Sequence, residues 1–223
     1  MLVKIKRQEN ADSIPYWQTF EYNGDKKATI AAVLDFLNYN DDLNDSAGNP
    51  ARRIRWECSC LQNICGACAM VINGTPALAC NTRLSDFKSE VLILEPLRKF
   101  PVCSDLIVDR SIIYKNLKRA QMYIGEYAGA DENEYDQQYT VSKCLKCGLC
   151  LEVCPNYAKG DNFFGALFAN DAYLSYTQTK DRKKEIKKQY KKHFAAGCSK
   201  SLSCASVCPA QIPTLASIAK MNK

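Results

Sequence analysis

The chain of 223 residues has a single histidine, two tryptophans and no long apolar run. No segment approaches the ~20 consecutive apolar residues that a membrane-spanning helix needs. The opening MLVKIKRQEN also lacks the apolar core of a secretory signal peptide. We therefore expect any membrane association to be peripheral or to occur through a partner.

Cysteine is the residue in excess, with 13 copies. A secreted disulfide scaffold is usually shorter than about 80 residues and has an even number of cysteines. This chain is longer and its count is odd. The composition therefore favours a reducing compartment and thiolates that bind metal.

The basic residues are concentrated in the second half of the chain. Residues 1–105 carry 12 basic and 13 acidic side chains, whereas residues 106–223 carry 18 and 11, which gives the formal net charge of +6. Hydrophobic residues at 47% and charged residues at 24% are ordinary for a globular protein.

The apolar pattern predicts an α+β first half and a helical second half. Residues 3–6, 19–22 and 91–94 are predicted strands, and residues 30–37 are one face of an amphipathic helix. Residues 71–72 and 75–80 are a predicted hairpin with Asn73-Gly74 as its turn. Beyond Pro101 the apolar spacing becomes helical, in stretches around 112–124, 163–168 and 186–194, with an exposed loop predicted at 127–139. We place the two domains at 1–104 and 105–223.

The first cysteine group lies in the first domain and comprises Cys60, Cys65, Cys68 and the distant Cys80. Its C-x4-C-x2-C spacing is the plant-type [2Fe–2S] pattern. Gly66 lets the backbone pass close to the sulfurs, where N–H donors tune the cluster. Reduced cysteines packed as small hydrophobic residues are the plain alternative, which four cysteines at this spacing disfavour.

Two further groups lie in the second domain and form an internal repeat. Cys144, Cys147, Cys150 and Cys154-Pro155 follow the bacterial ferredoxin spacing, in which the fourth cysteine binds the other cluster. A shift of 54 residues superimposes this run on Cys198, Cys204 and Cys208-Pro209, and places Cys147 on Ser201. One ligand of the repeat is therefore missing.

The crossed pattern assigns the ligands of two clusters. Cys144, Cys147, Cys150 and Cys208 are predicted to bind a complete [4Fe–4S] cluster. Cys154, Cys198 and Cys204 supply three thiolates, so we predict a [3Fe–4S] cluster there. A [4Fe–4S] cluster with Ser201 or water on its fourth iron is the alternative.

Zinc is the main chemical alternative, because C-x2-C pairs also bind zinc. Zinc sites use separate pairs, often with histidine, whereas these runs interlock. We expect His193 to be a surface residue of a lysine-rich helix and not a ligand. Cys58 and Cys103 are left over, and we interpret both as non-ligands, since Cys58 breaks the spacing to Cys65.

The combination resembles the iron–sulfur subunit of succinate dehydrogenase and fumarate reductase, over nearly the whole chain. The motifs that carry the resemblance are Ser59-Cys60, Cys65-Gly66, Asn73-Gly74, Ala79-Cys80, Phe100-Pro101-Val102, the run at 105–109 and the two Cys-Pro pairs. The ending from Ile212-Pro213-Thr214 to Met221-Asn222-Lys223 is similar to the menaquinone-linked bacterial branch.

The resemblance implies a β-grasp plant-type ferredoxin domain followed by an all-helical bacterial double-ferredoxin-like domain. It implies a FAD-containing flavoprotein subunit, a cytochrome b-type membrane-anchor subunit and quinone as partners, with no nucleic acid. It also implies a place on the cytoplasmic face of the bacterial inner membrane, and no catalytic residue in this chain.

Three positions depart from many ubiquinone-linked members. Lys159 and Ser199 stand near or at places where those members have tryptophan and histidine, and Ala210 stands where lysine is common. The quinone site therefore cannot be transferred residue by residue.

The iron–sulfur subunit of another flavoprotein complex, which usually lacks the plant-type domain, is the second interpretation. A zinc-binding interaction module is the third.

A basic stripe precedes the third cysteine group. Its lysines recur at helical spacing on one face, with Ile186, Tyr190 and Phe194 opposite. The stripe is either a solvated helix face or a surface for anionic lipid head groups. No aromatic or loop motif for nucleic-acid bases accompanies it. Its members are Lys183, Lys184, Lys187, Lys188, Lys191 and Lys192.

Overall fold

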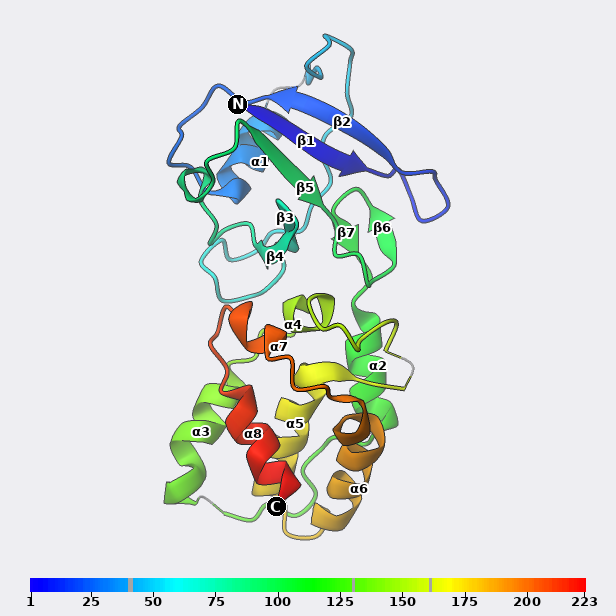
Figure 1. The fold of residues 1–223 in the computed structure, drawn as a ribbon, viewed down its shortest axis with the longest axis vertical. Helices are drawn as coiled ribbons and strands as arrows, with labels where there is room; N and C mark the ends of the chain where they lie inside the picture. Colours follow the sequence, from blue (N-terminus) through cyan, green and yellow to red (C-terminus); the bar gives the residue numbers. More distant parts are fainter. Residues whose placement is uncertain (40–41, 130, 161) are drawn as a thin grey trace. The chain divides into compact units, whose positions relative to one another are not determined.

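The computed structural model describes residues 1–39, 42–129, 131–160 and 162–223 (Figure 1). Its internal contacts divide the chain into two units, Met1–Asp109 and Arg110–Lys223. The first unit is built on a sheet and the second on helices, which confirms the predicted α+β class. Within the described ranges, no helix combines the length and apolarity that crossing a membrane requires.

A five-stranded sheet in the order β2-β1-β5-β3-β4 forms the first unit. β1 (Leu2–Arg7) pairs antiparallel with β2 (Tyr16–Glu21) and parallel with β5 (Val91–Glu95). β3 (Ala69–Ile72) pairs antiparallel with both β5 and β4 (Thr75–Leu78). The predicted strands are confirmed, and their alternating apolar residues point into the core, as the strand period requires.

One helix supplies the other half of this core. α1 (Ile30–Tyr39) buries the periodic apolar face that the sequence predicted. A short 3-10 helix, η1 (Leu84–Asp86), lies between β4 and β5 and buries Leu84. The buried face of α1 consists of Ile30, Ala31, Val33, Leu34 and Leu37.

The predicted Asn73-Gly74 turn joins β3 to β4. Both residues have positive φ, 46° and 81°, the conformation that asparagine and glycine tolerate best. The Asn73 amide oxygen accepts a 2.7 Å hydrogen bond from the Ile93 N–H, and the Asn73 N–H donates to the Ile93 carbonyl at 2.8 Å. The hairpin is thus held to β5, which fixes the place at which Cys80 follows β4.

A second hairpin, which the sequence did not predict, carries a buried carboxylate. β6 (Val102–Ser104) and β7 (Ile107–Val108) flank Asp105, whose φ is 46°. The Asp105 carboxylate lies 3.0 Å from Arg7 Nε and accepts the N–H groups of Gln8 and Arg55 at 3.0 and 2.9 Å. Both charged side chains are fully buried. This ion pair therefore holds the segment that leads into the cysteine loop.

Helices form the second unit, which confirms the predicted helical half. They pack around a core that includes Phe168, Tyr173, Ile186 and Tyr190. The elements are α2 (Ser111–Arg119), α3 (Glu132–Ser142), α4 (Leu149–Glu152), α5 (Gly165–Gln178), α6 (Lys183–His193), η2 (Ala195–Gly197), α7 (Ser203–Ser206) and α8 (Thr214–Asn222).

The exposed loop predicted at 127–139 is wrong for most of that stretch, because α3 begins at Glu132. The Asp131 side chain accepts a hydrogen bond from the Asn133 N–H and caps the helix. Glu132 and Glu134 lie in the first turn, where negative charge is favourable. The acidic composition that indicated a loop is therefore a helix-start signal.

Two further predictions in the second unit are corrected. α2 ends at Arg119, so Ile124 lies outside the helix and is 41% exposed. His193 is buried, not on the surface: its ring stacks on Phe164 at 4.0 Å, and Nδ1 lies 3.1 Å from the Asn162 carbonyl oxygen. Burial lowers the pKa of His193, which favours the neutral ring in this position.

We predict that Asp105→Asn destabilises the first unit by roughly 3 kcal/mol, because Arg7 is left as a buried, unpaired charge. Asparagine tolerates the positive φ at this position, so the backbone is preserved. Urea unfolding followed by circular dichroism measures the change. Glu9→Gln is the matched control, since Glu9 faces Arg52 at 3.6 Å and is exposed. Equal stability of the two variants would contradict the prediction.

Candidate metal centres

The cysteine loop of the first unit places its thiols by repeated left-handed turns. Leu61, Asn63 and Gly66 have φ of 53°, 63° and 75°. Left-handed backbone at a residue other than glycine costs roughly 1–2 kcal/mol. Leu61 carries this cost, whereas asparagine tolerates the conformation better, so the shape of the loop at Leu61 is set by something other than local preference.

Amide hydrogen bonds to sulfur account for that shape. Cys60, Cys65, Cys68 and Cys80 each accept a backbone N–H, and such donors stabilise negative charge on sulfur. Four predicted ligands are thereby brought together by one loop and the end of β4. The donors are Gln62 to Cys60 at 3.3 Å, Asn63 to Cys80 at 3.4 Å, Ala67 to Cys65 at 3.4 Å and Cys80 to Cys68 at 3.5 Å.

The four thiols differ strongly in acidity. Hydrogen bonds from the Gln62 and Ile64 N–H groups lower the pKa of Cys60 to about 7. Burial raises the pKa of Cys68 to about 12, and the neighbouring Cys80 and Cys65 add to the effect. The loop therefore stabilises the thiolate of Cys60 without a metal, whereas Cys68 needs a positively charged group beside it to lose its proton.

The internal repeat of the second unit is a repeat of backbone structure. α4 and α7 have four residues each and are related by the same 54-residue shift as the cysteines. Positive φ recurs before each helix, at Lys146 and Lys200 (54° and 59°) and at Gly148 and Leu202 (87° and 62°).

Hydrogen bonds recur at the same shift. The Tyr157 N–H donates to the Cys154 carbonyl at 3.2 Å, and the Gln211 N–H donates to the Cys208 carbonyl at 3.1 Å. Cys154 and Cys208 themselves donate to the carbonyls of the equivalent residues Leu151 and Ala205. The repeat inferred from cysteine spacing is therefore a structural one, and Ser201 occupies the place that corresponds to Cys147.

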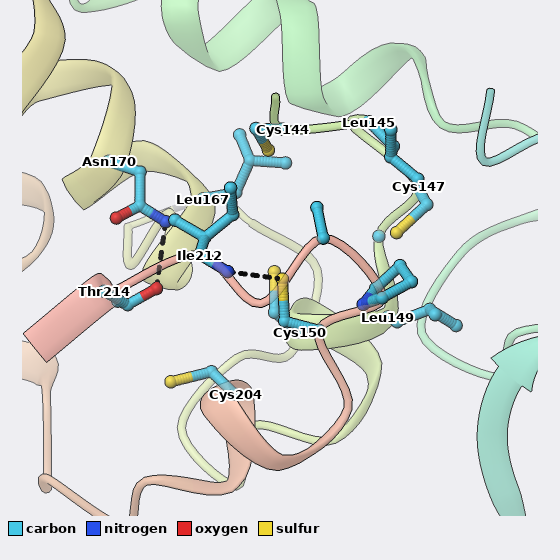
Figure 2. A pocket seen from close by; sticks show the side chains of 14 residues that line it. Cys144, Leu145, Cys147, Leu149, Cys150, Leu167, Asn170, Cys204, Ile212 and Thr214 are labelled. Atoms are coloured by element: carbon cyan, nitrogen blue, oxygen red, sulfur yellow. Dashed lines mark hydrogen bonds between the residues drawn. The ribbon is translucent and has the colours of Figure 1, made fainter. Parts of the chain in front are cut away.

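The first cavity of the second unit lies beside α4 (Figure 2). It encloses about 420 Å3, part of it open to solvent, and its apolar lining includes Leu149, Leu167 and Ile212. The Ile212 N–H donates to Cys208 Sγ at 3.4 Å. Figure 2 shows Cys150 on α4 and Cys204 entering from α7. The cysteines that line the cavity are Cys144, Cys147, Cys150, Cys204 and Cys208.

Burial makes these thiols poor acids on their own. It raises the pKa of Cys147 to about 11 and raises the pKa of Cys144 and Cys150 as well. A metal ligand must be deprotonated, so binding here releases protons and requires positive charge from the metal. An apolar, thiol-lined cavity of this kind fits a group that carries its own positive charge.

The second cavity contains the other predicted ligands. Cys154, Cys198 and Cys204 line it together with Ser201, and it encloses about 850 Å3 including open solvent. Ser201 is exposed, and its hydroxyl accepts a 3.3 Å hydrogen bond from Ser203 Oγ. The 54-residue shift relates Cys198, Ser201 and Cys204 to Cys144, Cys147 and Cys150 of the first cavity. The second cavity therefore has a hydroxyl where the first has the thiol of Cys147. The apolar wall includes Phe163, Phe194, Leu215 and Ile218.

The remaining cysteines lie outside these arrangements. Cys58 is exposed in the loop before the first group, and Cys103 is exposed on β6. Across the part of the chain that the structure describes, no three His, Cys, Asp or Glu side chains are placed for one metal ion. The thiols of the second unit instead line two cavities, an arrangement that suits clusters of several metal ions.

Comparisons with known proteins identify the family. A family model described as a 2Fe-2S iron-sulfur cluster binding domain matches residues 2–115, and one described as a 4Fe-4S dicluster domain matches residues 139–212. The succinate dehydrogenase iron-sulfur subunit of Bacillus subtilis (strain 168) is 32% identical, over 98% of this chain and 90% of the relative. The chain belongs to the family of succinate dehydrogenase and fumarate reductase iron–sulfur subunits.

A further relative agrees with this assignment, and a solved structure shares the fold. The fumarate reductase iron-sulfur subunit of Wolinella succinogenes is 26% identical, over 96% of this chain and 92% of the relative. A chain of the Mycobacterium smegmatis Sdh1 complex in the apo form shares the fold, with a TM-score of 0.76 at 23% identity over 99% of this chain and 93% of that one. The resemblance predicted from the sequence is confirmed.

Family membership gives the subunit an electron-transfer role in an oxidoreductase complex. Its two matched domains bind [2Fe–2S] and [4Fe–4S] clusters. The amide donors to sulfur in the first unit and the thiol-lined cavities in the second fit such clusters. The zinc-binding module is thereby disfavoured, as is an iron–sulfur subunit without the plant-type domain.

An ion pair beside the first cavity was missed by the sequence reasoning. Lys146, between Cys144 and Cys147, pairs with Asp171 on α5. Burial raises the pKa of Asp171, which Lys146 opposes. No spacing signal links the two residues, because their contact depends on how α5 packs. The equivalent of Lys146, Lys200, is exposed on the second cavity.

We predict that in the cluster-free protein iodoacetamide alkylates Cys60 well before Cys68 at neutral pH. Cys60 has a lowered pKa and is partly exposed, whereas Cys68 is buried and protonated. Raising the pH toward the pKa of Cys68 should narrow the difference. Timed peptide mass spectrometry gives both rates, and similar rates at pH 7 would contradict the acidity contrast.

Proposed function

We propose that the subunit relays electrons between the FAD of a flavoprotein subunit and a membrane quinone pool. The observation that carries the proposal is that eleven cysteines gather at one loop and two cavities, with Cys204 lining both cavities. The cysteine spacing then divides them into sets of four, four and three. The ligand sets are Cys60, Cys65, Cys68 and Cys80 for [2Fe–2S]; Cys144, Cys147, Cys150 and Cys208 for [4Fe–4S]; and Cys154, Cys198 and Cys204 for [3Fe–4S].

The crossed ligation of the two second-unit clusters is supported by cavity lining. Cys208, from the second half of the repeat, lines the first cavity with the three cysteines of the first half. Cys154, from the first half, lines the second cavity with Cys198 and Cys204. Each cluster would thus link the two halves of the repeat and hold them together.

The [3Fe–4S] assignment follows from Ser201. A serine hydroxyl is neutral at physiological pH, unlike a cysteine bound to iron, so it is a weak replacement for thiolate. Ser201 is also exposed and hydrogen-bonded to Ser203, away from the burial that Cys147 has in the equivalent position. The fourth iron therefore lacks its anchor.

The protein groups around the sites hold the clusters and set their environment. When bound, the clusters supply reversible one-electron carriers. The backbone N–H groups stabilise the sulfurs, and the apolar residues Leu149, Leu167 and Ile212 limit water at the first cavity. Lys146 and Asp171 add a fixed dipole beside Cys144. No residue of this chain is proposed to act on the dicarboxylate, which is assigned to the flavoprotein.

The same proposal extends to assembly and location. We infer a FAD-containing flavoprotein subunit and a cytochrome b-type membrane anchor as partners, with quinone bound near the [3Fe–4S] cluster. The complex would lie on the cytoplasmic face of the bacterial inner membrane, with this subunit peripheral. The support is the family and the resemblance of the motifs.

Ser201→Cys is expected to convert the [3Fe–4S] cluster to [4Fe–4S], because the added thiolate anchors the fourth iron. Electron paramagnetic resonance at graded potentials checks the change. The wild type should give signals from reduced [2Fe–2S], reduced [4Fe–4S] and oxidised [3Fe–4S], and the variant should lose the last. Absence of that signal from intact wild-type protein would contradict the assignment.

Cys198→Ala in the assembled complex is expected to abolish electron transfer from succinate to quinone. Reduction of a dye that takes electrons directly from the flavin should continue, because this chain is not needed for dicarboxylate chemistry. Cys58→Ala, an exposed cysteine outside the three sets, is the control and should retain both activities. Quinone reduction by Cys198→Ala at the wild-type rate would overturn the relay.

A further inference from the structure

Helix α6 presents a continuous cationic face, here called the lysine face. The positions follow i, i+1, i+4, i+5, i+8 and i+9, so all six ammonium groups lie along one side of a helix about 16 Å long. Five of the six residues are exposed and Lys187 is partly buried. The lysine face consists of Lys183, Lys184, Lys187, Lys188, Lys191 and Lys192.

The opposite side of α6 is anchored in the core, which fixes the direction of the lysine face. Ile186 and Tyr190 are fully buried, and the Tyr190 hydroxyl donates to Asn222 Oδ1 at 3.1 Å. Phe194, directly after the helix, stacks on Phe163 at 5.5 Å. The helix cannot rotate its lysines inward without breaking these contacts, so the charges remain outward.

Few contacts within the protein compensate this charge. Among the residues that the structure describes, none of the six lysines forms an ion pair with a carboxylate. The one acidic residue of α6, Glu185, accepts a 2.7 Å hydrogen bond from Gln189 Nε2. Lys183 lies 5.8 Å from the ring of Tyr176, a weak interaction at this distance. The lysine face therefore has its charge available for an external partner.

We propose that the lysine face binds the anionic head groups of a phospholipid surface, so that the subunit makes its own membrane contact in addition to its partners. The face has lysines only, which attract anions as mobile point charges, and lacks the arginine fork that suits bidentate recognition of phosphate or base. Nucleic acid is further disfavoured by the lack of exposed aromatic residues on α6.

Exposed apolar residues near the end of α6 support a lipid partner over an acidic protein. Leu202 and Leu215 are 46% and 50% exposed, and both line the second cavity together with Phe194. Lysines along α6, with partly exposed leucines beside the residue that follows the helix, match the head-group and acyl layers of a membrane.

The 223-residue subunit with its clusters reconstituted is tested against vesicles of phosphatidylcholine alone and of phosphatidylcholine mixed with phosphatidylglycerol. The variant replaces Lys184, Lys188 and Lys191 by glutamine, which has similar helix propensity. The control replaces Lys26, Lys27 and Lys88 by glutamine, three exposed lysines of the first unit. Both triple variants lose the same net charge, so a difference between them reports the lysine face itself.

Flotation should show binding to the mixed vesicles and not to phosphatidylcholine alone, with loss at high salt because exposed charges are screened within ~10 Å at 0.1 M. The α6 variant should bind on the order of 100-fold more weakly, since each lysine near an anionic surface contributes about fivefold. The control should bind like the wild type. The cluster absorption spectrum confirms that all three proteins are folded.

Three outcomes would overturn the proposal. The first is absence of binding to the mixed vesicles at low salt, and the second is equal weakening by both triple variants. The third is displacement from vesicles by a DNA duplex at equal phosphate concentration, which would assign the face to nucleic acid. If the wild-type complex failed to reduce quinone but the subunit still bound vesicles through its lysines, the result would count against the proposed electron relay and not against the lysine face.

Discussion

The hydrogen bond from a backbone N–H to a cysteine sulfur is the interaction on which the metal centres depend. In the first unit all four predicted ligands accept one, and three of the donors lie in the loop in which Leu61, Asn63 and Gly66 adopt left-handed backbone. Such a loop is unfavourable in isolation. The sheet and the Arg7–Asp105 ion pair supply the rigid frame on either side of it.

In the second unit one backbone arrangement occurs twice, and its two copies differ in their side chains. The backbone of α4 and of α7 repeats, including the left-handed residues before each helix. The side chains diverge: Gly148 corresponds to Leu202, and Cys147 to Ser201. Lys146 is paired with Asp171, whereas Lys200 is exposed. In the copy around α4 the lysine is thus partly buried and paired with a carboxylate. In the copy around α7 the corresponding lysine is exposed to solvent. The two cavities therefore differ in their electrostatic surroundings, which suits clusters with different roles.

Sequence reasoning succeeded where one local rule decides the outcome. The period of α1 and the Asn73-Gly74 turn are such cases. Cysteine spacing predicted the internal repeat, which the backbone around α4 and α7 shows, and the division of ligands among clusters stays a prediction. It failed where tertiary contacts decide. His193 lies in a lysine-rich helix that looks solvent-exposed, yet packing against Phe164 buries it. The β6–β7 hairpin is too short for a period, and Asp105 is positioned by Arg7, almost a hundred residues away.

The two units differ in how far their folding can proceed without metal. The first has its own apolar core of sheet and α1, and Cys60 is already acidic enough to be a thiolate near neutral pH. In the second, α4 and α7 have four residues each, far below the ~12 that a helix needs for stability alone. They contact each other beside a cavity whose buried thiols are protonated until metal arrives. Cluster binding there should therefore release protons and strengthen as the pH rises. Because each cluster there would draw ligands from both halves of the repeat, metal binding would be coupled to the packing of α4 against α7. The longer helices have their own apolar core around Phe168, Tyr173 and Tyr190, so this coupling concerns the cysteine segments.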